Sequence, residues 1–165
     1  MKTIVILGST GSIGTNTLDL VDRFPEEFRV AGLTAGSNDE KLEDQIRRFK
    51  PRIVALSDAS AAARLRHRCE GLPVEILAGQ EGLIQVASAP EAELVISAIV
   101  GGAGLVPTLA AIRSGKQIAL ANKEPMVMAG KLMQAEARKH GVRIFPVDSE
   151  HSAIFQSMEG HRRQD

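Results

Sequence analysis

The sequence contains no tryptophan and no tyrosine, and its only cysteine is Cys69. A single cysteine cannot form an intrachain disulfide bond, so nothing indicates an oxidising compartment. We interpret Cys69 as a partly buried thiol near the end of a helix, not as a catalytic nucleophile. The absence of tyrosine excludes the tyrosine–lysine chemistry of short-chain dehydrogenases for this chain.

An excess of charge of one sign is also missing, because 20 basic and 20 acidic residues give a formal net charge of +0. The composition therefore lacks the electrostatic footprint of a nucleic-acid-binding protein and has no charged arm for a membrane surface. The amino terminus, MKTIVILG, has no apolar run long enough for a signal peptide or a membrane span. We expect a cytoplasmic protein that binds neither nucleic acid nor membranes.

Short apolar runs alternate with amphipathic segments along the chain. The predicted strands cover residues 3–7, 28–33, 53–56, 74–77, 94–97, 117–120 and 142–147. The predicted helices cover residues 13–24, 38–50, a segment opened by Asp58, 80–87, 106–114, 126–140 and 149–158. Short strands separated by helices are typical of a mainly parallel sheet with helices on both faces. The sequence predicts a Rossmann-like, doubly wound α/β fold.

Two helix features are predicted in more detail. In the first helix, apolar spacing indicates a buried side, which consists of Ile13, Thr17, Leu20, Val21 and Phe24. For the second helix, either Asn38 or Asp39 supplies the amino-terminal cap.

The segment GSTGSIG at residues 8–14, called the glycine loop below, follows the first predicted strand and opens the first helix. In a dinucleotide site, Gly8 permits the tight turn, Gly11 lets the backbone approach pyrophosphate, and Gly14 allows close helix packing. The helix amino terminus then favours an anion. A glycine-rich turn without a ligand is the alternative. The loop has no lysine, which excludes a P-loop.

The end of the second strand bears on the choice of cofactor. NAD sites usually place a carboxylate about 20 residues beyond the loop, on the ribose 2′-hydroxyl. Residues 34–38 read TAGSN and contain no carboxylate, which favours NADPH, although no arginine or lysine stands in this turn. Asp39 follows directly and is interpreted as a possible helix cap.

Polar residues also follow the later strands, at the edge where ligands bind in open α/β sheets. Asn122, Lys123 and Glu124 follow one strand. Asp148 and Glu150 follow the last strand, and their hard oxygen atoms suit Mg²⁺ or Mn²⁺. The alternatives are a helix cap for residues 148–150 and a solvated pair for residues 123–124.

Several segments together resemble the 1-deoxy-D-xylulose 5-phosphate reductoisomerase family, in order and over nearly the whole chain. They are ILGSTGSIGTNTLDLV, AGSN, SAIVGGAGLVPTLAAIRSGKQIALANKE and FPVDSEHSAIFQS. The resemblance implies an NADPH-dependent oxidoreductase that converts 1-deoxy-D-xylulose 5-phosphate to 2-C-methyl-D-erythritol 4-phosphate in the non-mevalonate isoprenoid pathway. It further implies a divalent cation and a homodimer of the full-length protein.

The same resemblance implies a role for each matching residue. Cofactor contacts are assigned to Thr10, Gly11, Ser12, Ile13, Gly36, Ser37, Asn38, Asn122 and Glu124. The catalytic candidates are Lys123, Asp148, Glu150 and His151, with Asp148 and Glu150 as metal ligands. Substrate contacts are assigned to Lys123, Ser149 and Glu150. Many relatives carry a basic residue where Ser37 stands.

The resemblance implies that the family's third metal-binding glutamate, lid loop and carboxy-terminal helical domain would follow beyond these 165 residues. We therefore expect residues 1–147 to form an NADPH-binding domain and residues 148–165 to begin a truncated catalytic domain. Such a chain is expected to be inactive alone. Two alternatives remain, a semialdehyde-type dehydrogenase with a nucleophilic cysteine and a non-catalytic nucleotide-binding domain.

Overall fold

The computed structural model describes residues 1–147 of the chain. In this part, seven strands form one sheet in the order β4-β3-β2-β1-β5-β6-β7. All neighbouring strands pair in parallel. The strands are β1 (Lys2–Leu7), β2 (Phe28–Ala35), β3 (Ile53–Leu56), β4 (Glu75–Ala78), β5 (Leu94–Ser97), β6 (Gln117–Leu120) and β7 (Ile144–Pro146).

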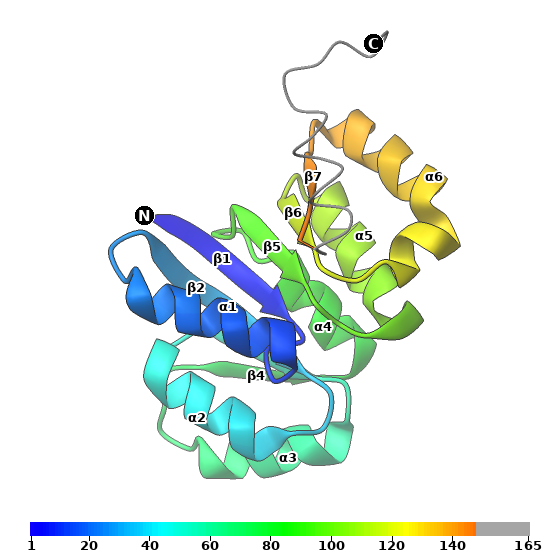
Figure 1. Ribbon diagram of the computed structural model, residues 1–165. Helices are drawn as coiled ribbons and strands as arrows, with labels where there is room; N and C mark the ends of the chain where they lie inside the picture. The colour runs from blue at the N-terminus through cyan, green and yellow to red at the C-terminus, as the bar shows by residue number, and fades with distance from the viewer. Residues whose placement is uncertain (148–165) are drawn as a thin grey trace, which may run out of the picture.

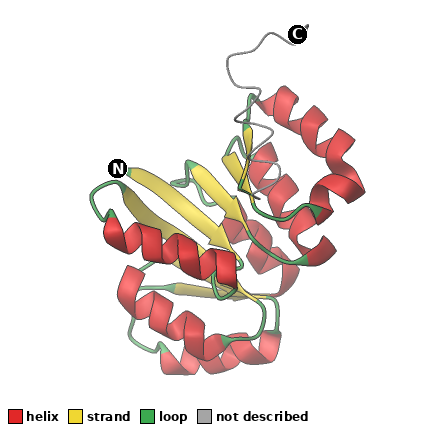
Figure 2. Ribbon diagram, in the orientation of Figure 1, coloured by secondary structure: helices red, strands yellow, loops and turns green. Residues whose placement is uncertain are grey.

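Helices cover both faces of the sheet (Figures 1 and 2). The helices are α1 (Ser12–Arg23), α2 (Asp39–Phe49), α3 (Ala59–Arg68), α4 (Gly79–Ala87), α5 (Leu105–Arg113) and α6 (Glu124–His140). A short 3-10 helix, η1 (Gly101–Gly104), precedes α5. Buried residues of α1, α2 and α3 belong to one hydrophobic cluster, and those of α4, α5 and α6 belong to the other. The predicted Rossmann-like fold is confirmed.

The central strand β1 is buried from both sides. Ile4 and Ile6 pack in the cluster with α1, whereas Val5 and Leu7 pack in the cluster with α4. Successive side chains of a strand point to opposite faces, so a strand covered on both faces must be apolar at every position. This explains the continuous apolar run from Ile4 to Leu7.

The order of the strands creates a switch point between β1 and β5. The chain moves from β1 outward through β2 and β3 to β4, and then returns through α4 to β5 on the other side of β1. The connections on the two sides of this point leave in opposite directions, and open α/β sheets bind ligands at such a point, in a crevice outside the carboxyl ends of the strands. The glycine loop follows β1 at this edge.

The predicted buried side of α1 is wrong in part. The buried residues of α1 are Gly14, Leu18 and Val21. Ile13, Leu20 and Phe24 are instead 38%, 47% and 45% exposed, and Thr17 is half-buried. The contact between Gly14 and the glycine loop determines the rotation of α1, and side-chain hydropathy does not report this contact.

The other predicted elements need only small corrections. Asn38, rather than Asp39, caps α2 through its side chain. Helix α6 begins at Glu124 instead of residue 126, and Ala129 interrupts its helical geometry with a φ of −146°. The predicted helix at 149–158 lies outside the described residues. No helix among the described residues is long and apolar enough to cross a membrane.

Substituting Gly14 with alanine tests the contact between α1 and the glycine loop. The added Cβ would lie 2.4 Å from the carbonyl oxygen of Gly8 and 2.5 Å from Cα of Ser9. Both neighbours are backbone, so we expect Gly14→Ala to lower the free energy of unfolding by about 1–3 kcal/mol or more. Urea unfolding followed by circular dichroism measures this loss.

Gly36→Ala is the matched control, because no heavy atom lies within 4 Å of a Cβ at Gly36. Its effect on the free energy of unfolding should stay within about 0.5 kcal/mol. Equal stability of the two variants would contradict the packing account of Gly14.

Candidate functional site

The glycine loop turns sharply at the end of β1. Gly8 has a φ of +85°, and a Cβ there would lie 2.7 Å from the carbonyl oxygen of Ala98. The backbone N–H groups of Gly8 and Ser9 both donate to the carbonyl oxygen of Thr34, at 3.1 and 2.8 Å. The end of β1 is therefore attached to β2 on one side and packed against the segment after β5 on the other.

A buried polar network holds the loop in this position. The Ser9 hydroxyl lies 2.6 Å from Oε1 of Gln45 on α2, and Nε2 of Gln45 donates to the carbonyl oxygen of Ser9 at 2.9 Å. The Thr34 hydroxyl accepts from the N–H of Gly8 at 2.9 Å. The sequence did not lead us to predict this network. The available signal was the position of Gln45 between Leu42 and Ile46 on the buried side of α2.

The amino terminus of α1 is open to a ligand. Gly11 is its N-cap residue, and no side chain caps this end. Gly11, Ser12 and Ile13 are exposed, and Thr10 is half-buried. The first N–H groups of a helix carry partial positive charge and have no partner within the helix. This donor set fits the phosphate groups of a dinucleotide.

The turn after β2 lies at the same edge of the sheet. Gly36, Ser37 and Asn38 are exposed. The carbonyl oxygen of Gly36 accepts from the N–H of Asp58 at 3.2 Å, which attaches the turn to the end of β3. Oδ1 of Asn38 accepts from the N–H of Lys41 at 3.0 Å. The turn is thus anchored through its backbone and its cap.

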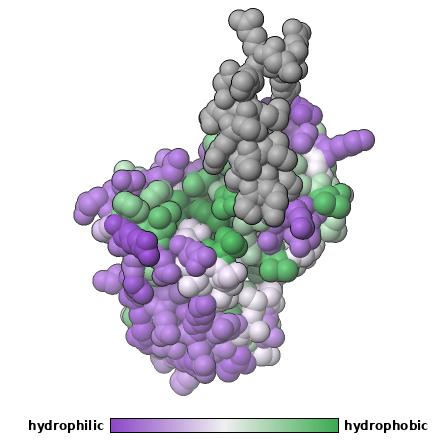
Figure 3. Space-filling view, in the orientation of Figure 1, coloured by the Kyte–Doolittle hydropathy of each residue, from purple (hydrophilic) through white to green (hydrophobic). Residues whose placement is uncertain are grey.

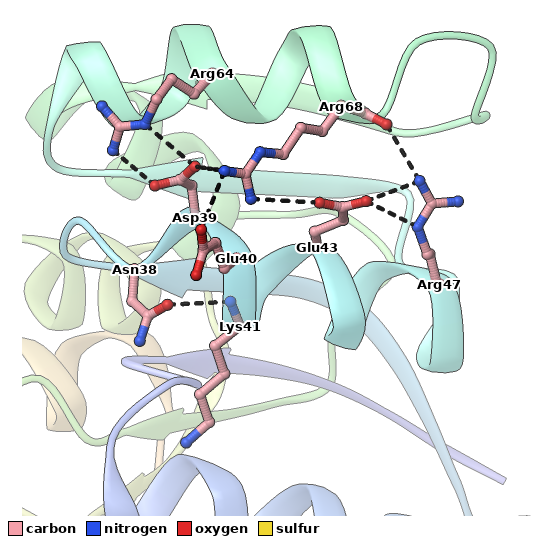
Figure 4. A network of polar contacts seen from close by, with 8 residues as sticks. All are labelled: Asn38, Asp39, Glu40, Lys41, Glu43, Arg47, Arg64 and Arg68. Carbon is pink, nitrogen blue, oxygen red and sulfur yellow. Dashed lines mark hydrogen bonds and ion pairs between the residues drawn. The ribbon is translucent and has the colours of Figure 1, made fainter.

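Asp39 is directed away from this turn and toward α3 (Figure 4). It is 5% exposed, and its carboxylate binds Arg64 at 2.7 Å and Arg68 at 3.6 Å. The hydrogen bond from Arg64 holds the pKa of Asp39 below its ordinary value, although burial opposes this effect. Asp39 is therefore an ion-pair partner between two helices and does not take the position of an NAD-selecting carboxylate.

Lys41 points to the opposite side of α2 (Figure 4). Its Nζ donates to the carbonyl oxygen of Thr10 in the glycine loop at 2.9 Å. A lysine three residues beyond the turn thus reaches the loop after β1. Lys41 was not predicted as part of the site, because it lies beyond the turn on the next helix and its contact is with a loop 31 residues earlier.

Asn122, Lys123 and Glu124 follow β6 at the same edge. The side-chain amide of Asn122 donates to the carbonyl oxygen of Ile99 and links the ends of β5 and β6. Lys123 is exposed and is the N-cap residue of α6, while Glu124 is half-buried in the first turn. The segments that follow β2, β1, β5 and β6 therefore line one continuous edge.

Asp148, Ser149, Glu150 and His151 lie outside the described residues. Their last described neighbour, Val147, donates its N–H to the carbonyl oxygen of Leu120 at 2.9 Å, at the end of β6. Residues 1–147 contain no group of three His, Cys, Asp or Glu side chains arranged to hold a metal ion.

Cys69 does not occupy the crevice. It is 4% exposed at the carboxyl end of α3, and burial raises the pKa of its thiol. Helix α3 runs from the end of β3 toward the start of β4, so Cys69 lies near the edge opposite the glycine loop. This position weighs against a cysteine-dependent semialdehyde dehydrogenase.

The parallel sheet, its switch point and the glycine loop place the chain in the class of Rossmann-like α/β proteins. A putative homoserine dehydrogenase from Archaeoglobus fulgidus shares this fold, with a TM-score of 0.57 at 23% identity. The chain belongs to the 1-deoxy-D-xylulose 5-phosphate reductoisomerase family, whose model matches residues 4–130.

Relatives within the family are much more similar. The reductoisomerase of Geotalea uraniireducens is 53% identical over 165 residues, which are 100% of this chain and 43% of that protein. The reductoisomerase of Anaeromyxobacter dehalogenans is 56% identical over 164 residues, 99% of this chain and 42% of that protein. The chain thus spans about two fifths of the length of these relatives.

Two solved structures extend the comparison. The Zymomonas mobilis reductoisomerase in complex with NADPH has a TM-score of 0.94 at 44% identity, covering 99% of this chain and 43% of that chain. A DOX-P reductoisomerase in complex with NADPH, fosmidomycin and magnesium has a TM-score of 0.91 at 45% identity. The match covers 94% of this chain and 38% of that chain.

The ion pair of Asp39 predicts a pH-dependent contribution to stability. Because the folded state lowers this pKa, the contribution is fully present above the ordinary value of about 3.9 and is lost as the pH falls through the lowered pKa. We expect Asp39→Asn to lower the melting temperature at pH 7, and the difference from wild type to shrink toward pH 2. Thermal melts across this range measure it.

Asp44→Asn, at an exposed position of the same helix, is the control and should change the melting temperature little at either pH. A difference between wild type and Asp39→Asn that stays constant with pH would show that the carboxylate charge is not responsible.

Proposed function

We propose that this chain is the NADPH-binding part of a 1-deoxy-D-xylulose 5-phosphate reductoisomerase. The observation that carries the proposal is the uncapped, exposed amino terminus of α1 beside the exposed turn at residues 36–38. The NADPH complex of the Zymomonas mobilis relative supports it. Residues 1–147 would form the cofactor domain, and residues 148–165 would begin the catalytic domain.

Each part of the cofactor would meet a different segment of the sheet edge. Thr10, Gly11, Ser12 and Ile13 would bind the pyrophosphate through the loop and the end of α1. Gly36, Ser37 and Asn38 would surround the adenosine 2′-phosphate, where a Cβ at Gly36 would meet open space. Asn122 and Glu124 would lie along the nicotinamide half. When bound, NADPH supplies the hydride for reduction.

The remaining roles concern the whole enzyme. Asp148 and Glu150 would supply two of the oxygen ligands of Mg²⁺ or Mn²⁺, and a third ligand would come from beyond this chain. The ion would act as a Lewis acid and a template for a sugar phosphate. Lys123 would stabilise negative charge on a substrate oxygen. Ser149 would hydrogen-bond the substrate, with His151 beside it.

The solved relative that holds NADPH, fosmidomycin and magnesium supports a site for a dinucleotide, a small molecule and a divalent cation. For the full-length protein we propose the formation of 2-C-methyl-D-erythritol 4-phosphate in isoprenoid synthesis, by a cytoplasmic homodimer. A non-catalytic nucleotide-binding domain is the second candidate, and it would not need the residues at 148–151.

The chain itself is expected to bind NADPH but not to turn over 1-deoxy-D-xylulose 5-phosphate. It contains the edge that receives the dinucleotide, whereas two carboxylates alone should hold Mg²⁺ weakly. Isothermal titration calorimetry measures binding, and the decrease in absorbance of NADPH measures turnover. Sustained oxidation of NADPH with substrate and Mg²⁺ would contradict the expected inactivity.

Gly11→Ala is the matched variant for the binding measurement. Its Cβ would lie 3.4 Å from the carbonyl oxygen of Gly8, an ordinary contact, so the fold should be retained. The methyl group would occupy the space in which the backbone approaches pyrophosphate. We expect a loss of NADPH affinity of about tenfold or more, with a change in the free energy of unfolding within about 0.5 kcal/mol. Unchanged affinity would contradict the proposed placement of the pyrophosphate.

A further inference from the structure

We propose that Lys41 binds the 2′-phosphate of NADPH and makes this site prefer NADPH to NADH. This inference rests on the proposed function, because it names the cation of the same cofactor site. Lys41 supplies the positive charge that the turn at residues 36–38 does not contain.

Lys41 contacts both segments between which the adenosine end of the cofactor would lie. Its Nζ lies 2.9 Å from the carbonyl oxygen of Thr10, in the glycine loop after β1. Its backbone N–H donates to Oδ1 of Asn38 at 3.0 Å, in the turn after β2. The ammonium group is therefore held at the loop while its backbone is held at the turn.

The charge of Lys41 is not neutralised by an ion pair within the described residues. Asp19 and Asp44 also line the hollow between α1 and α2 that Lys41 lines. Among the described residues, neither carboxylate lies within 4.0 Å of Nζ, the limit for an ion pair. An ammonium group has three N–H donors, so the bond to Thr10 leaves two for phosphate oxygens.

The charged groups that α2 and α3 direct at one another beside the turn are already paired (Figure 4). Two N–H groups of Arg64 donate hydrogen bonds to the carboxylate of Asp39, at 2.7 and 3.3 Å. Arg68 contacts Asp39, Glu40 and Glu43. These pairs turn the carboxylate of Asp39 toward α3, away from the turn that would receive the phosphate. Lys41 is thus the cation that remains directed at the glycine loop.

The test separates a phosphate contact from a purely structural role. If Lys41 only held the loop in place through Thr10, its loss would weaken the binding of NADPH and of NADH alike. If it binds the 2′-phosphate, its loss should weaken the binding only of ligands that carry this group. We would measure the dissociation constants of NADPH, NADH, 2′,5′-ADP and 5′-AMP for the 165-residue chain by calorimetry.

For Lys41→Gln and Lys41→Met, we expect affinity for NADPH and 2′,5′-ADP to fall by about tenfold or more, since contacts to charged groups contribute this much. Affinity for NADH and 5′-AMP should change less than about twofold. Lys41→Arg should keep most of the preference for NADPH. Lys2→Gln, which removes an exposed lysine at the start of β1 on the opposite edge, should behave as wild type.

Unchanged NADPH affinity in both charge-removing variants would overturn the assignment of Lys41, and so would an equal loss for NADH and NADPH. Failure of the proposed function has a different signature, because the wild-type chain would then bind neither NADPH nor 2′,5′-ADP.

Discussion

The first turn of α1 packs directly on the backbone of the glycine loop, and this contact requires Gly14 to have no side chain. The same contact places the amino terminus of α1 over the switch point between β1 and β5. On the other side of the loop, Gly8 approaches Ala98 too closely for any Cβ. Two glycines thus bring three segments together. These close approaches hold the uncapped amino terminus of α1 at this edge, where its free N–H groups would suit an anion.

The charges around the turn after β2 are arranged by tertiary contacts. Asp39, which follows the turn directly, binds arginines of α3, and Lys41 extends the other way to the loop. Figure 3 shows hydrophilic side chains gathered over α2 and α3, where these ion pairs lie, and a more hydrophobic surface near the first turns of α6. Val127 and Met128, in those turns, are 82% and 63% exposed. Recognition of a phosphate would thus depend on which charges are paired and which remain directed at the edge.

Sequence patterns were sufficient for the strands, their connections and the glycine loop, because these depend on local apolar runs and on spacing. They failed at the buried side of α1, where the close contact of Gly14 outweighs hydropathy. They also missed Gln45 and Lys41, since both act on a loop more than 30 residues earlier in the chain. Residues 148–151 lie outside the described residues, so their roles, which rest on residue type and on resemblance to the family, stay predictions.

The most direct test of the account is to map the NADPH site on the chain by amide chemical shifts in solution. NADPH should shift the amides of residues 8–14, 36–41 and 98–102, together with that of Asn122. Shifts concentrated instead at the opposite edge, in the apolar hollow lined by Ile46, Pro51 and Leu72, would contradict it.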